Sequence, residues 1–167
     1  MTSTTDKTLA IDGGDPIRTE AFPGRPAVTP ADDRDPVSAL ESEFAGYLDA
    51  DAPAISCRDS AAAYALAFGV LGINGGEAVV PALAADAAVE AARAAGLTIV
   101  PGEVEAESVD LGTRGLARAA SDETRVVIAG HAFGHPFAAA ELQRVLEPRS
   151  LPLIEDASAA LGGAYRR

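Results

Sequence analysis

The stretch Leu151–Ser158 (LPLIEDAS) is a short apolar run that ends in two acids and continues into small residues. An aliphatic run of this length is typical of a parallel strand that is covered on both faces. In open α/β sheets, ligands bind outside the carboxyl ends of the strands. The stretch therefore predicts a buried strand over residues 151–154, which presents Asp156 at the ligand-binding edge of a sheet.

The chain before this stretch alternates short apolar runs with segments of helical periodicity. The predicted strands cover residues 54–57, 78–81, 97–100 and 125–130. The predicted helices cover residues 35–48, 60–71, 84–95, 113–120 and 136–146. Such alternation indicates parallel strands joined by crossover helices. We predict a three-layer α/β/α sandwich with a mostly parallel sheet.

The first 34 residues differ in composition from the rest. They contain a run of Pro and Gly residues, which predicts an extended arm over residues 1–34 and not an independent unit. The remaining residues, 35–167, are enough for one α/β domain with its own core.

Charge and cysteine content exclude several classes of function. The formal net charge of −12 argues against nucleic acid or an anionic membrane as a partner, because both are polyanions. No apolar run approaches the roughly 18 residues of a membrane helix, and the polar start lacks a signal-peptide core. Cys57 is the single cysteine, so we expect no disulfide within the chain, no cysteine-based metal site and a small buried side chain. These features predict a cytoplasmic protein.

Several landmarks occur in order along nearly the whole chain. They are LAIDGGDPIR at 9–18, EFAGYL at 43–48, LGI at 71–73, GGEAVVP at 75–81, TIV at 98–100, TRVVI at 124–128, HAFG at 131–134 and IEDA at 154–157. With these landmarks the chain resembles the N-terminal half of the DegT/DnrJ/EryC1/StrS family, the pyridoxal-phosphate-dependent sugar and aminocyclitol aminotransferases of antibiotic and surface-polysaccharide pathways. The resemblance implies an incomplete fold-type I aminotransferase large domain over residues 35–167.

The resemblance also implies which positions would contact the coenzyme. Asp156 matches the family Asp that keeps the pyridine nitrogen protonated, and a cap of the next segment is its other interpretation. The family's phosphate-binding Ser-Gly-Thr turn aligns with Asp59-Ser60-Ala61, where a carboxylate would repel the phosphate. Ser60 remains a weak cofactor-binding candidate, and either Asp59 or Ser60 is also a plain helix N-cap.

Other family positions have changed. The aromatic residue expected after Val80-Pro81 is missing from residues 82–86, and the family's Gln and His fall on Ala159 and Leu161. Transamination also needs a lysine that holds the coenzyme as a Schiff base. The only lysine, Lys7, matches no catalytic position. We therefore expect no coenzyme in this chain alone, and pyridoxal phosphate only where a partner chain completes the site.

His131 and His135 are weaker candidates. His131 matches a family His at the end of a core strand, where a structural role is commoner than a catalytic one. The two residues are four positions apart, as in helical metal sites, but Gly134 and Pro136 argue against a helix there. No metal site is predicted.

Three hypotheses follow. The first is a catalytically degenerate half-aminotransferase, which acts as a non-catalytic stabilising or regulatory subunit of a full-length homologue in a natural-product pathway. Its partner would be that homologue or a second copy, as a dimer that covers an otherwise unpaired sheet edge. The second is a coenzyme-independent enzyme that uses Asp156, Asp59, His131, His135 or Cys57 as acids, bases or nucleophile. The third is one piece of a split aminotransferase completed in trans.

Overall fold

Helix α1 (Pro36–Tyr47) belongs to the first of two units into which the chain divides, with the division after Ala54. The fold is taken from a computed structural model that describes residues 35–135 and 137–161. Asp35 precedes α1, and its Oδ2 accepts a hydrogen bond from the Ser38 N–H at 3.0 Å, so the helix starts with a side-chain cap and a proline in its first turn. This confirms the helix predicted over 35–48. The predicted arm, residues 1–34, lies outside the described residues.

The second unit contains the alternating elements. In chain order they are α2 (Ser60–Val70), β1 (Gly76–Pro81), α3 (Asp86–Ala94), β2 (Leu97–Gly102), α4 (Thr113–Ala119), β3 (Thr124–Gly130), the 3-10 helix η2 (Ala132–Gly134), α5 (Ala139–Leu146), the 3-10 helix η3 (Glu147–Arg149) and β4 (Leu153–Asp156). The strands form a four-stranded sheet of order β2-β1-β3-β4, and every pairing is parallel. The predicted α/β class and parallel sheet are confirmed.

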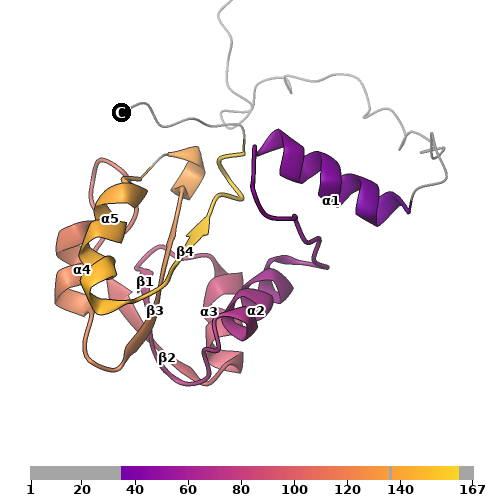
Figure 1. The fold of residues 1–167 in the computed structure, drawn as a ribbon. Coiled ribbons are helices and arrows are strands. Elements are labelled where there is room, and N and C mark those ends of the chain that lie inside the picture. The colour runs from indigo at the N-terminus through magenta and orange to yellow at the C-terminus, as the bar shows by residue number, and fades with distance from the viewer. Residues whose placement is uncertain (1–34, 136, 162–167) are drawn as a thin grey trace, which may run out of the picture. The chain divides into compact units, whose positions relative to one another are not determined.

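Alternating side chains of the central strands point to opposite faces of the sheet. Ala78 and Ile128 pack in a cluster with α2 and α3, whereas Val79 and Val127 pack in a second cluster with α4 and α5. Figure 1 shows these helix pairs on the two sides of the strands. The result is the predicted three-layer sandwich with one apolar core on each face of the sheet.

Two predictions about residues 54–57 are wrong. These residues form no strand, and the Ile55 side chain is 64% exposed. Cys57 is exposed and not buried, because it lies in this irregular segment ahead of α2 and not in a strand of the sheet. A strand needs a hydrogen-bonding neighbour, which local sequence does not supply.

Several boundaries also differ from the prediction. Helix α3 begins two residues late, at Asp86, because a turn from Ala84 N–H to the Pro81 carbonyl at 2.9 Å comes first. Helix α5 begins at Ala139, after Phe137 has entered the core with 3% exposure. Strand β4 runs from Leu153 to Asp156, so both of its ends lie two residues later than those of the strand predicted over 151–154.

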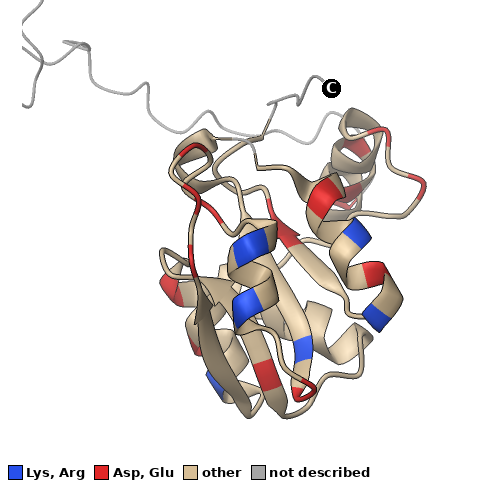
Figure 2. Ribbon diagram, turned by 90° about the vertical axis from the view of Figure 1, so that its left-hand side faces the viewer, with Lys and Arg blue, Asp and Glu red and all other residues tan. Residues whose placement is uncertain are grey.

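Helices α4 and α5 both carry charged residues. Figure 2 faces these helices and shows basic positions on each. Arg114 and Arg118 belong to α4, and Glu141 and Arg144 belong to α5. No helix within the described residues has the length and apolarity needed to cross a membrane.

Candidate functional site

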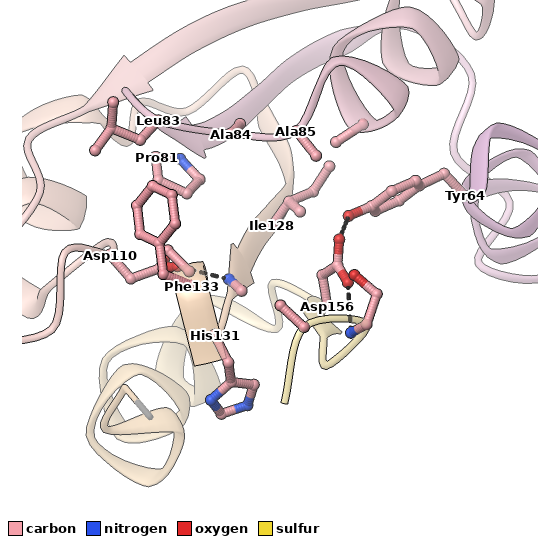
Figure 3. A pocket seen from close by; sticks show the side chains of 15 residues that line it. Tyr64, Pro81, Leu83, Ala84, Ala85, Asp110, Ile128, His131, Phe133 and Asp156 are labelled. Atoms are coloured by element: carbon pink, nitrogen blue, oxygen red, sulfur yellow. Dashed lines mark hydrogen bonds between the residues drawn. The ribbon is translucent and has the colours of Figure 1, made fainter. Parts of the chain in front are cut away.

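A cavity of about 210 Å³ lies where the carboxyl ends of β1, β3 and β4 meet. Pro81, Gly130 and Asp156, the last residues of these strands, all line it. Its polar side chains are those of Tyr64, Asp110, His131, Asp156 and Ser158. Figure 3 shows Asp110 on one side of the cavity and the Tyr64–Asp156 pair on the other. The cavity thus occupies the position at which open α/β sheets bind ligands.

Asp156 has hydrogen-bond donors at both carboxylate oxygens. The Tyr64 hydroxyl donates to Oδ2 at 2.5 Å, and the Ser158 N–H donates to Oδ1 at 2.9 Å. Burial alone would raise the pKa of Asp156, but the hydrogen bonds from Ser158 and Tyr64 outweigh it and leave this pKa below its ordinary value. Burial and the bond to Asp156 raise the pKa of Tyr64. The pair is therefore an ionised carboxylate that accepts a bond from a neutral phenol.

Asp110 is a second carboxylate at the cavity and is only 2% exposed. Its Oδ1 accepts from the Leu111 N–H at 2.6 Å, and its Oδ2 accepts from the Gly130 N–H at 3.1 Å. Burial raises the pKa of Asp110, although these backbone donors oppose the shift. The bond to Gly130 ties the loop before α4 to the end of β3.

His131, a weak catalytic candidate, follows β3 and lines the cavity, but its ring is engaged elsewhere. Its Nε2 lies 2.7 Å from Glu155 Oε1, and its ring centroid lies 4.8 Å from that of Phe137. Figure 3 shows the ring turned away from Asp156 and Tyr64. Its Nδ1 is buried and has no hydrogen-bond partner among the described residues. In this geometry the ring contacts Glu155 and Phe137, and the catalytic role of His131 stays a prediction.

The other candidates of the coenzyme-independent hypothesis do not join this cavity. His135 lines a separate pocket with Glu105, Glu107 and Glu141, while Asp59 and Cys57 do not line the cavity of Asp156. Within residues 35–135 and 137–161, no group of three or more His, Cys, Asp or Glu side chains is placed to hold a metal ion. Asp156 and His131 are the two members of that set which share one cavity.

The turn before α2 is capped by its own carboxylate. Asp59 Oδ1 accepts from the Ala62 N–H at 2.8 Å, and Oδ2 accepts from Arg58 Nε at 2.9 Å. The bond from Ala62, with that from Arg58, lowers the pKa of Asp59. Ser60, the first residue of α2, lines a second groove with Asp156, between α2 and β4. The structure thus brings Ser60 and Asp156 to one groove, with a negative charge beside them.

These residues do not fit pyridoxal phosphate. A phosphate at the start of α2 would compete with Asp59 for free N–H groups and would face its negative charge. Asp156 by contrast keeps the chemistry to hold a pyridine nitrogen, because each of its carboxylate oxygens accepts one hydrogen bond and has a further lone pair. The described residues include no lysine for a Schiff base.

Sequence reasoning missed Tyr64 and Asp110 as members of the site. Tyr64 lies in the helix predicted over 60–71, where no local pattern marks it as a site residue, and its partner lies 92 positions away. Asp110 ends an acidic loop in which nothing local separates it from Glu103, Glu105 or Glu107. A buried pairing between distant segments leaves no local pattern that would reveal it.

Comparisons with known proteins bear on the family of the chain and on its fold. The model of the DegT/DnrJ/EryC1/StrS aminotransferase family matches residues 33–167. A dTDP-3-amino-3,4,6-trideoxy-alpha-D-glucose transaminase from Streptomyces venezuelae is 32% identical over 131 residues, which are 78% of this chain and 34% of that relative. A 3-amino-5-hydroxybenzoate synthase from Amycolatopsis mediterranei is 30% identical over 133 residues, 79% of this chain and 34% of the relative.

Solved structures show the same partial correspondence. The crystal structure of a 3-amino-5-hydroxybenzoic acid synthase superposes with a TM-score of 0.71 at 31% identity, over 75% of this chain and 33% of that one. The S. venezuelae enzyme DesV, solved with a ketimine intermediate, gives a TM-score of 0.71 at 31% identity, over 75% of this chain and 34% of the other. The chain spans about a third of the length of the curated relatives it matches.

Proposed function

We propose, from the premise that the chain belongs to the DegT/DnrJ/EryC1/StrS aminotransferase family, that it is a non-catalytic member which binds and stabilises or regulates a full-length sugar or aminocyclitol aminotransferase in a natural-product pathway. The proposal has two parts. The chain does not hold pyridoxal phosphate by itself, and an unfilled sheet edge provides the contact with its partner.

The cap of α2 carries the first part. Asp59 Oδ1 occupies the Ala62 N–H at 2.8 Å, so the helix start offers an anion a negative charge in place of a free donor. The low pKa of Asp59, set by the bonds from Ala62 and Arg58, keeps that charge at neutral pH. A coenzyme whose main anchor is a phosphate dianion is repelled at this turn.

The β4 edge supports the second part. Strand β4 pairs with β3 alone among the described strands, and the groove between β4 and α2 has apolar walls from Ala63, Ala67 and Ile154. On α2, Val70 is 77% exposed and Leu66 is 41% exposed. A sheet edge without a described neighbour and exposed apolar side chains each favour association with another chain. A full-length homologue, or a second copy, is the partner we propose.

Equilibrium dialysis against pyridoxal phosphate tests the first part. We expect no retention by the wild-type chain at micromolar to millimolar coenzyme. The variant Asp59→Ser/Ser60→Gly/Ala61→Thr restores the turn that the family uses, and we expect it to retain phosphate-bearing coenzyme more strongly than pyridoxal. Asp35→Ser is the matched control, because it changes the cap of α1 by the same chemistry. Tight binding by the wild-type chain, with a visible aldimine band, would overturn the proposal.

Co-expression with full-length family members from the same source tests the second part. We expect co-elution in size-exclusion chromatography and a change in the partner's thermal stability or activity. A chain that binds no homologue and stays monomeric contradicts the proposal. If the complex instead gains coenzyme and activity that neither chain has alone, the split-enzyme interpretation replaces it.

A further inference from the structure

The apolar side chains of α1 gather on one face of the helix. At about 100° of rotation per residue they fall within an arc of about 100°, which is the width of a face that a helix normally buries. None of the described residues of α1 is buried, and the members of this face are 38–62% exposed. They are Val37, Leu40, Phe44, Tyr47 and the C-cap residue Leu48, and we call them the α1 face. An exposed apolar face of this kind is typical of a contact surface.

Helix α1 also needs a packing surface for its own stability. It has 12 residues, and an isolated helix of that length is marginal in water. Gly46, near its C-terminal end, lowers the helix propensity further. The Asp35 cap supports the first turn, but most helical stability in proteins comes from the packing of an amphipathic face. Covering the α1 face would therefore order the helix as well as remove apolar surface from water.

Acidic residues border the α1 face on both sides. On the same helical count, Glu43 lies about 40° outside one edge of the face, and Glu41 lies about 20° outside the other. Residues 35–54 contain five acids and neither Lys nor Arg. Two α1 helices packed face to face would bring these acids together in either orientation, which disfavours the α1 of a second copy as the occupant. An anionic membrane is disfavoured for the same reason.

The pattern instead fits the recognition of a helix in a protein groove. Such helices place their anchors at i, i+3 and i+7, which is the spacing of Val37, Leu40 and Phe44. Phe44 and Tyr47 add two aromatic rings with centroids 6.4 Å apart, and aromatic anchors carry much of the binding energy of protein interfaces. The acids on both sides of the face require positive charge on both rims of the groove, because facing potentials at an interface are complementary.

We propose that the α1 face docks in a groove of the full-length homologue, with an apolar floor and with Arg or Lys on both rims. This inference rests on the proposed function and adds a second contact to the one at the β4 edge. Helix α1 and β4 belong to the two different units of the chain. Two linked contacts give a higher overall affinity than either contact alone, provided that both can engage one partner.

Binding of the full chain to full-length homologues from the same source, measured by isothermal titration calorimetry, tests the proposal. Leu40→Ser/Phe44→Ser removes two apolar anchors, and we expect it to weaken the complex at least about tenfold. Val145→Ser on α5 is the matched control, because Val145 is as exposed as Phe44, at 38%, and lies outside both proposed contacts. We expect this control to leave the affinity unchanged.

A charge reversal tests the rims of the groove. We expect Glu43→Lys to weaken the complex about threefold or more, because it turns an attraction into a repulsion. Added salt should weaken the wild-type complex more than the complex of this variant. Glu90→Lys on α3 makes the same change at another exposed acid and is the matched control, for which we expect unchanged affinity.

Each outcome decides between the two proposals. Unchanged affinity in Leu40→Ser/Phe44→Ser, with a circular dichroism spectrum like that of the wild type, would overturn this inference and leave the proposed function standing. Equal weakening in Glu43→Lys and Glu90→Lys would overturn it as well, since the charge effect would then be general. A wild-type chain that forms no complex with any homologue contradicts both proposals.

The chain without a homologue tests the other possible occupants of the α1 face. A wild-type dimer that Leu40→Ser/Phe44→Ser abolishes would assign the face to a second copy. A lower free energy of unfolding in the monomeric variant would assign it to the second unit of the same chain. Either result would overturn the inference, and we expect neither.

Discussion

Strands β3 and β4 lie side by side in one sheet, yet the two are covered very differently. In β3, residues 126–129 are 2% exposed or less, whereas every described residue of β4 is at least partly exposed. Among the described strands, β3 has β1 on one side and β4 on the other, while β4 pairs with β3 alone. The central strand thus carries the core, and the edge strand carries Asp156 to the cavity and remains available for other contacts.

The largest expected effect comes from a matched pair of truncations. Ile128 in β3 and Ile154 in β4 are register partners and pack on the same face of the sheet. We expect Ile128→Ala to lower the free energy of unfolding by about 2–5 kcal/mol, because its side chain is 2% exposed. We expect less than about 2 kcal/mol for the half-buried Ile154. Urea denaturation of the two variants measures both.

Equal losses of unfolding free energy in the two variants would contradict the difference in burial between β3 and β4. They would mean that a partner chain or another part of this chain already covers β4 in solution. Repeating the measurement at several protein concentrations tells these two cases apart, because association makes stability depend on concentration.

The next effect concerns the polar contact that joins β4 to α2. Tyr64→Phe leaves Asp156 Oδ2 without its 2.5 Å hydroxyl donor, and bonds to charged groups of this kind contribute roughly 1.5–3 kcal/mol. Thermal and urea unfolding at neutral pH measure the loss. Asp156 should also titrate at a higher pKa in the variant, which carboxyl NMR detects. Tyr47→Phe in α1 is the matched control; its hydroxyl belongs to the other unit, and we expect no change in the titration of Asp156.

The pH dependence of that difference has a definite sign. The pKa of Asp156 is lower in the folded chain than its ordinary value of 3.8, so the group stabilises the fold above 3.8. This contribution is lost as pH falls through the folded-state pKa. The gap between wild type and Tyr64→Phe should therefore be full above pH 3.8 and shrink below it. A gap that stays constant into strong acid would show that Tyr64 acts through packing and not through the carboxylate.

The smallest expected effect is at the other acid of β4. Glu155 pairs with His131 at 2.7 Å, but the Glu155 side chain is 45% exposed. An exposed pair of this kind contributes at most about 1 kcal/mol, and the amide oxygen in Glu155→Gln still accepts from the ring. A decrease in melting temperature that is smaller than the decrease in Tyr64→Phe supports the view that Asp156 makes the principal polar contact of β4. A larger shift would make the His131 contact the principal one.

The sequence predicted the parts of the fold that follow from local pattern. Alternating apolar runs and periodic segments were sufficient for the order of strands and helices, and the position of Asp59 before an alanine-rich run predicted an N-cap that the structure confirms. The strand predicted at 54–57 failed, because its β-forming residues have no neighbouring strand among the described residues. The coenzyme roles of Asp156 and Ser60 and the catalytic role of His131 stay predictions.

The amino-acid order by itself determined the α/β class, the parallel sheet and the family, since these depend on periodicity and on motifs within short windows. Only the tertiary structure decided which charges meet. Tyr64 and Asp156 are 92 positions apart, and Asp110 reaches the Gly130 N–H across 20 positions, so these contacts exist only because the carboxyl ends of neighbouring strands converge. Electrostatic pairing depends on distance in space and on burial. Neither quantity can be read from the order of residues before the fold is known.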